Sequence, residues 1–263
     1  IEAPPSRPIN WEVDCGKEFY SERSIGILSF LPLMAQLGID KWIEEAQYPG
    51  TSILDRKHNI LSFLALKLSG HRRYHHDDLW AMDRAAGLFA SLNVLPKTST
   101  LSTYSSRVSR AMNRRFLKAM AIQMEKLNLY SGQVNLDFTA IPHWGDESVL
   151  ENNWSGKRNK ALKSVLAALC QDPDSGVFYY SNSEFDKKTQ NDFVLEFLDF
   201  WKTNESKISC LIFDSKFTIY QNLQKLDEDG IKFITLRRRG PKLVEETKKI
   251  PEDQWQDINV EGQ

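Results

Sequence analysis

The chain has 263 residues, of which 41% are hydrophobic and 11% aromatic, and its formal net charge is -1. This length and apolar content predict a globular protein with one large domain or two smaller ones. The balanced charge carries no general signal for nucleic acid, so any attraction for DNA would come from local basic patches. No apolar stretch approaches the roughly 20 residues of a membrane span, and the N-terminus lacks the features of a signal peptide.

The cysteines favour a reducing environment, because an odd number of widely spaced thiols is unlike a disulfide framework. There are three of them, Cys15, Cys170 and Cys210, and the last two lie in apolar runs where a buried thiol is ordinary. We therefore expect a protein of the reducing cytoplasm, with no membrane partner.

The first half of the chain carries helical periodicity. A polar, proline-rich arm runs to about Trp11, and apolar residues then recur at helical spacing in 24–37 and 52–68, with a Pro-Gly breaker between them. A further helix is predicted over 77–90, and capping residues predict another that starts near Thr100. We expect a helical N-terminal domain over residues 1–130.

The helix that starts near Thr100 is predicted to be amphipathic. At about 100° per residue, one face is apolar and the opposite face is basic. The basic stripe comprises Arg107, Arg110, Arg114 and Lys118, and the apolar face comprises Val108, Met112, Phe116, Met120 and Leu127. The stripe would suit a DNA backbone, although an exposed helix face is often basic for solubility alone.

After Gly132 the periodicity changes to that of strands. Runs at 133–139, 163–170 and 176–181 predict three strands, and the turn that begins Asp172-Pro173 makes the last two a hairpin. The remaining predicted elements are a helix over 192–201, a strand over 208–214, a helix over 218–227 and a strand over 231–236. Each strand–helix–strand step implies a right-handed parallel crossover, so we expect a mixed sheet in which the first and fourth strands are neighbours.

Two aspartates each close one of these apolar runs, Asp137 on the first strand and Asp214 on the fourth. A carboxylate in such a place is costly to bury unless it has a partner, so a pair on adjacent strands predicts a shared divalent cation. The alternative is structural, with each acid paired to a lysine or capping a turn.

Three segments in this order resemble the DDE transposases of bacterial insertion sequences: Leu136-Asp137-Phe138-Thr139, the run from Leu211 to Phe217 around Asp214, and the run from Ile231 to the basic end Arg237-Arg238-Arg239. The resemblance covers about 131–240. It implies a mixed α/β fold with a ribonuclease H-like core, flanked by helices and preceded by an α-helical domain. It also implies that Asp137 and Asp214 are catalytic acids that bind Mg²⁺ or Mn²⁺.

The same resemblance implies double-stranded DNA as substrate, self-association as a dimer, and a place in the bacterial cytoplasm with the nucleoid. The third acid of that family is a glutamate on a later helix, within a Tyr, Arg, Glu, Lys pattern, and no such helix or pattern is evident here. Residues 241–263 are interpreted as the start of an insertion or linker, so we expect a chain that is truncated before that acid and of low activity. The glutamates there are Glu245, Glu246, Glu252 and Glu261.

Other basic residues are candidates for phosphate contact. They are Lys157, Arg158 and Lys160 before the second strand, and Arg237, Arg238 and Arg239 after the last one. A solvated basic loop explains the first group nearly as well. Asp146 and Glu147 are interpreted as solvating a loop rather than as auxiliary carboxylates.

The sequence thus predicts a transposase that cleaves and joins DNA at element ends by two-metal-ion phosphoryl transfer. One alternative is a catalytically inactive, transposase-derived regulator that binds DNA. Another is a ribonuclease H-like nuclease, which a glutamate between 245 and 261 would complete.

Overall fold

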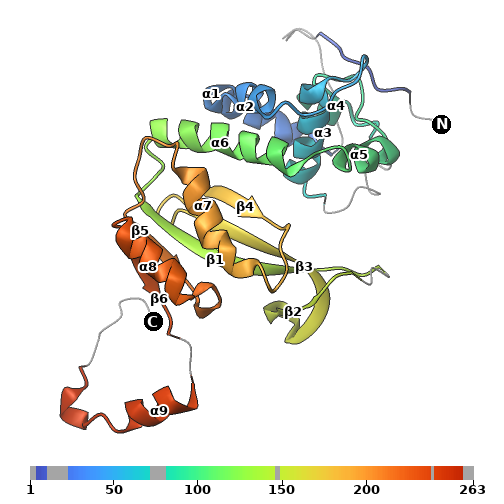
Figure 1. The fold of residues 1–263 in the computed structure, drawn as a ribbon. Helices are drawn as coiled ribbons and strands as arrows, with labels where there is room; N and C mark the ends of the chain where they lie inside the picture. The colour runs from blue at the N-terminus through green and yellow to red at the C-terminus, as the bar shows by residue number, and fades with distance from the viewer. Residues whose placement is uncertain (1–3, 11–22, 72–80, 146–148, 238–239, 257–263) are drawn as a thin grey trace. The chain divides into compact units, whose positions relative to one another are not determined.

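The chain forms two units that are described separately, a helical unit, Ile1–Tyr130, and a sheet unit, Ser131–Gln263 (Figure 1). Within the part that the structure describes, no helix is long and apolar enough to cross a membrane. The structure is a computed structural model, and the residues that it describes are 4–10, 23–71, 81–145, 149–237 and 240–256.

The helical unit is built from short helices around one apolar core. Residues such as Ile43, Leu92 and Leu101 are completely buried there. In chain order the elements are a 3-10 helix Ile25–Phe30, α1 (Leu31–Leu37), α2 (Ile39–Ala46), α3 (Arg56–Leu68), α4 (Arg84–Phe89), α5 (Thr98–Ser105) and α6 (Arg110–Lys126).

Several boundaries differ from those predicted. The helix expected over 24–37 divides where a proline lies in the first turn of α1, a position that a helix tolerates well. Helix α2 was not predicted. Helix α3 begins at Arg56, later than expected, because the Asp55 carboxylate accepts a hydrogen bond from the His58 N–H at 3.0 Å and caps the first turn. Of the helix predicted over 77–90, residues 77–80 lie outside the described residues.

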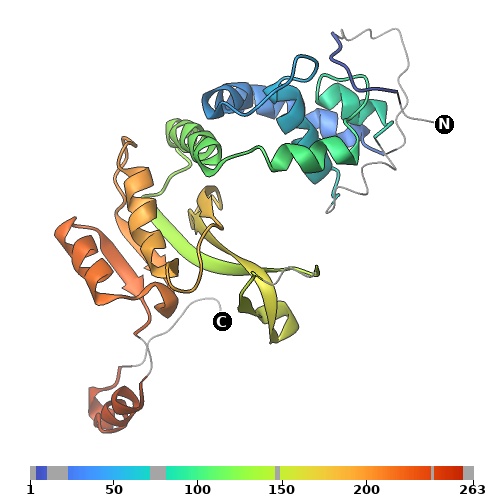
Figure 2. The same cartoon turned by 45° about the vertical axis from the view of Figure 1, so that its right-hand side comes forward.

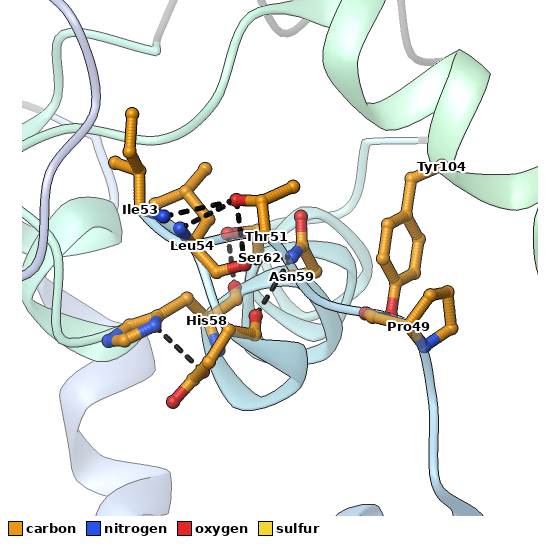
Figure 3. A network of polar contacts seen from close by, with 9 residues as sticks. Pro49, Thr51, Ile53, Leu54, His58, Asn59, Ser62 and Tyr104 are labelled. Carbon is orange, nitrogen blue, oxygen red and sulfur yellow. Dashed lines mark hydrogen bonds and ion pairs between the residues drawn. The ribbon is translucent and has the colours of Figure 1, made fainter.

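The turn before α3 is held by polar contacts that connect it to α5 (Figure 3). Thr51 Oγ1 accepts from the Leu54 N–H at 2.9 Å, and the buried Asn59 side chain donates to the Leu54 carbonyl at 3.3 Å. From α5, Tyr104 Oη donates to the Pro49 carbonyl at 2.9 Å. Burial raises the pKa of Tyr104 to about 12, so the phenol remains a donor at neutral pH.

The single long helix predicted from Thr100 was wrong, because α5 ends at Ser105 and α6 begins at Arg110. Serine side chains in this segment bond to the main chain and compete with helix continuation. Ser105 Oγ donates to the Ser102 carbonyl at 2.8 Å, and Ser109 Oγ accepts from the Met112 N–H at 3.4 Å as the cap of α6. The apolar face was predicted correctly over Val108, Met112 and Phe116, which pack against the core.

The sheet unit contains strands joined by helices in the expected order. The helices are α7 (Phe193–Trp201), α8 (Tyr220–Glu228) and α9 (Pro241–Lys248), and the strands are β1 (Gln133–Pro142), β2 (Asn152–Ser155), β3 (Lys160–Gln171), β4 (Phe178–Asn182), β5 (Cys210–Phe213) and β6 (Lys232–Thr235).

The strands form one mixed sheet in the order β2-β3-β1-β5-β6, and β4 also pairs with β3. The β1–β3 and β3–β4 pairs are antiparallel, whereas β1–β5 and β5–β6 are parallel. The predicted hairpin, both parallel crossovers and the neighbouring first and fourth strands are therefore confirmed. So is the fold class, a mixed α/β sheet flanked by helices after an α-helical region. Strand β2 was missed, because Asn-Asn-Trp-Ser is short and polar.

Aromatic side chains hold α7 against the sheet, where Figures 1 and 2 show it beside β1 and β4. Phe138 of β1 stacks on Phe217, with 4.0 Å between the ring centroids. Phe193 of α7 lies 6.0 Å from Phe217 and 5.9 Å from Tyr180 of β4. The prediction that Phe193, Phe197, Phe200 and Trp201 form a packing face is confirmed, since all are buried.

The amino ends of β1 and β5 are fixed by a buried carboxylate. Asp172, in the turn after β3, accepts from the Ser131 N–H at 2.7 Å and from Ser131 Oγ at 2.8 Å. The next residue, Gly132, has φ +89°, and its carbonyl accepts from the Ser209 N–H at 2.8 Å, just before β5. A Cβ on Gly132 would lie 3.0 Å from Ser209 Oγ, so glycine permits both the φ angle and this close approach.

Candidate metal and nucleic-acid site

Asp137 and Asp214 occupy matched positions on neighbouring strands. The last pair in the parallel β1–β5 register is Leu136 with Phe213. Asp137 directly follows Leu136, and Asp214 directly follows Phe213. Neighbouring strands lie about 4.8 Å apart, so the two carboxylates leave adjacent points of the sheet. The arrangement that the sequence predicted, two acids on adjacent strands in the centre of the sheet, is present in the structure, with Asp137 in the middle of β1 and Asp214 directly after β5.

The two acids differ in exposure. Asp137 is exposed, because Leu136 and Phe138 on either side of it turn toward the packed face and alternation turns Asp137 the other way. Asp214 is half-buried and is the cap of a short 3-10 helix, Ser215–Phe217, where its Oδ1 accepts from the Lys216 N–H at 2.7 Å. The idea that both acids are buried was therefore wrong, and the turn-capping role considered for them applies to Asp214.

Each acid is anchored by its neighbours in the chain. Phe138 follows Asp137, and Phe217 ends the short helix that Asp214 caps, so the 4.0 Å stacking of their rings holds the two acidic segments together. On the far side, Thr235 Oγ1 of β6 donates to the Asp214 carbonyl at 3.4 Å and lies 2.8 Å from Thr218 Oγ1. The main chain at both aspartates is thus fixed by packing within the sheet unit.

The carboxylate oxygens of Asp137 and Asp214 suit a hard divalent cation, but these two residues offer few ligands. One oxygen of each carboxylate is used, Asp137 Oδ1 by the Phe138 N–H at 2.8 Å and Asp214 Oδ1 by Lys216. The second oxygen of each carboxylate takes part in neither of these bonds, and carboxylate oxygens are what Mg²⁺ and Mn²⁺ prefer. Among those residues, no group of three His, Cys, Asp or Glu side chains comes together.

The stretch after Gly240, interpreted as the start of an insertion or linker, contains a helix that was not predicted. Residues Pro241–Lys248 form α9, with proline in its first turn, a position where its missing N–H costs nothing. Helix α9 carries Glu245 and Glu246, but neither belongs to a group of potential metal ligands in the described part of the chain. Glu261 lies outside the described residues.

The first basic group lies where β2 turns into β3. Lys157 and Arg158 belong to a 3-10 turn, Gly156–Arg158, and Lys160 is the first residue of β3, so the strand starts earlier than predicted. All three side chains are exposed. Arg158 lies over the ring of Trp144, with 4.7 Å from Cζ to the ring centroid. Asp146 and Glu147 lie outside the described residues.

The second basic group borders a hollow beside β6. Arg237 lines a pocket of about 650 Å³ together with Tyr220, Lys242 and Thr218, and Glu246 of α9 lies at the same pocket. Arg238 and Arg239 lie outside the described residues. Tyr220, 77% exposed, and Lys242 were not considered from the sequence. A tyrosine at the start of a helix does not by itself indicate a binding site. Tyr220 becomes a candidate only because the fold places it at the same pocket as Arg237.

The basic stripe of the helical unit is interrupted by the break between α5 and α6. Arg107 lies before α6, with its guanidinium 5.2 Å from the centre of the Tyr104 ring, whereas Arg110, Arg114 and Lys118 keep helical spacing on α6. Lys118 lines a hollow between α2 and α6, and burial lowers its pKa. The stripe is therefore not one continuous helix face.

Comparisons with known proteins find a similarity among the solved structures. No protein-family model matches the sequence, and no curated protein matches it. The chain is similar to a piggyBac transposase, seen by cryo-EM in a synaptic complex with hairpin DNA, with a TM-score of 0.44 and 12% identity. The similarity covers 86% of this chain and 54% of that one, so this chain spans about half the length of that transposase.

Proposed function

We propose that this protein is a metal-dependent polynucleotidyl transferase of the transposase type, which cuts and joins double-stranded DNA at the ends of an insertion sequence. The observation that carries the proposal is the matched position of Asp137 and Asp214, each of which follows the last residue pair of the parallel β1–β5 register. Two aspartates on adjacent strands would form an anionic site that a divalent cation would neutralise.

Asp137 and Asp214 would hold Mg²⁺ or Mn²⁺ through the oxygens that the main chain does not use. Bound there, the ions would stabilise charge on the attacking and leaving oxygens of a phosphodiester. Exposure of Asp137 gives a DNA strand access to the site. A further acid would come from residues outside the described ranges or from a second chain of a dimer.

The basic residues would hold the DNA by its phosphates, which fixes the position of the strand without reading its sequence. In the sheet unit these are Lys157, Arg158, Lys160 and Arg237, with Arg238 and Arg239 outside the described residues. In the helical unit, we propose that Arg107, Arg110, Arg114 and Lys118 contact DNA as two groups, the first within the break between α5 and α6 and the other three on α6.

Calorimetric titration with Mn²⁺ and Mg²⁺ tests the metal site. We expect Asp137→Asn and Asp214→Asn each to weaken binding at least about tenfold, as loss of groups around a metal commonly does. Asp174→Asn is the matched control, because Asp174 is an exposed acid in the β3–β4 turn. Unchanged affinity in both site variants would refute the assignment.

One observation favours a second function, a DNA-binding regulator without catalysis. In the described part of the chain, Asp137 and Asp214 have no third carboxylate or histidine beside them. Such a protein would bind DNA without weakening in the Asp137→Asn variant and would not nick supercoiled plasmid in Mn²⁺. Metal-dependent nicking that both substitutions abolish would decide for the enzyme.

A further inference from the structure

An exposed apolar surface begins at the carboxyl end of β1, a few residues after Asp137. It is formed by residues 141–145 and 149–163, called here the β2 arm, which extends from the sheet around β2 and the start of β3 (Figures 1 and 2). Large apolar side chains there are more than half exposed: Ile141 53%, Trp144 63%, Val149 82% and Trp154 59%. Two tryptophans so exposed on one short segment are unusual for a surface that contacts only water.

The pairing of β2 with β3 leaves the ring of Trp154 open. Burial alternates along β2, so that Asn153 and Ser155 are buried while Trp154 is exposed. In the antiparallel register Trp154 is opposite Ala161, which is also exposed. Opposite residues lie on the same side of a sheet, and a methyl group is too short to cover an indole ring. A flat aromatic surface is therefore available at this position.

The second tryptophan, Trp144, makes a cation–π contact with Arg158. Arg158 Cζ lies 4.7 Å from the centroid of the Trp144 ring, within the range of a cation–π contact. This contact holds the guanidinium beside the aromatic surface and leaves most of the Trp144 side chain exposed. The arrangement places a phosphate-binding group next to a ring on which a base can stack.

The described part of the arm carries more basic than acidic side chains. Lys157, Arg158 and Lys160 are exposed within a few residues of Trp154. The acid in the described part of the arm is Glu151, and its Oε2 accepts from the Lys187 N–H at 3.0 Å. Cations beside open aromatic rings are the combination that binds single-stranded nucleic acid, in which phosphates meet the cations and unpaired bases stack on the rings.

We propose that the β2 arm binds an unpaired, single-stranded segment of DNA, with bases stacked on Trp144 and Trp154 and phosphates held by Lys157, Arg158 and Lys160. The inference rests on the proposed function in that it takes DNA to be the substrate. The bases of an intact duplex stack on one another and offer no face to an indole, so the arm distinguishes single strands from duplex.

Fluorescence anisotropy with a labelled oligonucleotide, once single-stranded and once annealed to its complement, tests this assignment. The titrations contain EDTA and one fixed salt concentration, so that the metal site does not contribute and the affinities can be compared. The variants are Trp154→Ala and Trp144→Ala. The matched control is Trp255→Ala, which removes a tryptophan that is 56% exposed outside the arm.

We expect each arm variant to bind the single strand about 5- to 150-fold more weakly, the range for loss of one base–aromatic stack. Affinity for duplex should stay within about twofold, and Trp255→Ala should match the parent on both ligands. Trp154→Phe keeps an aromatic face and should retain most of the affinity, which separates lost stacking from misfolding.

Three results would overturn the inference: unchanged single-strand affinity in both arm variants, an equal loss for single strand and duplex, or a change in sedimentation with no change in DNA binding. The last would make the arm a surface for self-association or for a protein partner. None of these bears on the metal titrations of Asp137→Asn and Asp214→Asn, so the arm and the metal site stand or fall separately.

Discussion

Replacing Asp172 by asparagine tests how the sheet unit holds its strands in register. The Asp172 side chain is completely buried, and its two oxygens accept five hydrogen bonds. Oδ2 accepts the two from Ser131 at the start of β1, and Oδ1 accepts three from Asp174 and Ser175 in the turn. Asparagine has the same shape, but one of its two terminal atoms is a donor.

The magnitude follows from which donors lose an acceptor. If the amide nitrogen takes the place of Oδ2, the Ser131 N–H faces another donor, whereas the opposite rotamer removes the acceptor from the Asp174 and Ser175 N–H groups. A buried donor without a partner costs about 1–3 kcal/mol, and the remaining bonds lose the strength that the charge gives them. We therefore expect Asp172→Asn to lower the free energy of unfolding by about 2–4 kcal/mol.

The pH dependence has a definite sign. Burial by itself raises the pKa of Asp172, but the hydrogen bonds from Ser131, Ser175 and Asp174 together outweigh it and hold the pKa below its ordinary value. A carboxyl whose pKa is lowered by folding stabilises the protein above its unfolded pKa, about 3.9, and this contribution is lost as the pH falls through the folded value. The gap between parent and variant should be constant near neutral pH and shrink in acid.

Urea denaturation followed by circular dichroism, repeated from neutral pH to below pH 4, would measure that gap. Asp174→Asn changes an exposed carboxylate in the same turn and leaves the hydrogen bond from its main-chain N–H, so it should be neutral. The reasoning is refuted if Asp172→Asn is as stable as the parent at neutral pH, or if Asp174→Asn costs as much.

Two further predictions concern the core around the candidate site. Phe217 is completely buried, so Phe217→Ala should cost about 3–5 kcal/mol in urea denaturation, whereas Phe178→Ala, at a site 48% exposed, should cost far less; similar losses would mean that the stacking beside Asp214 is not part of the core. Burial raises the pKa of the Cys170 thiol well above its ordinary value. In a Cys15→Ser, Cys210→Ser variant, we therefore expect no reaction of the remaining thiol with Ellman's reagent at pH 8 until urea unfolds the chain, and rapid reaction of the native protein would contradict this.

Local signals in the sequence accounted for most elements of the sheet unit. Apolar runs with turn residues between them identified β1, β3, β4, β5 and β6, and the turn at Asp172 identified the β3–β4 hairpin. Strand–helix–strand order, with its fixed handedness, was enough to make β1 and β5 neighbours. The two aspartates were identified because each closes such a run.

Local signals failed where competing interactions were close in energy. The apolar period continues across 106–109, but serine side chains bond to the main chain there and end α5. Strand β2 has too few residues for a pattern and exists because β3 pairs with it. Helix α9 was not predicted, because it lies in a polar, proline-containing stretch that was interpreted as the start of an insertion or linker, although proline suits the first turn of a helix.

The sequence by itself determined the chemistry available to this protein: two acids that close apolar runs, basic clusters, and enough apolar surface for two units. The tertiary structure decided which groups meet. The register that matches Asp137 with Asp214 is set by contacts between segments far apart in the chain, such as the Gly132 carbonyl with the Ser209 N–H. The meeting of Arg158 with Trp144 likewise follows from the path of the chain through β2. Periodicity reports the face on which a residue lies, whereas its partner across the sheet depends on pairing that only the folded chain supplies.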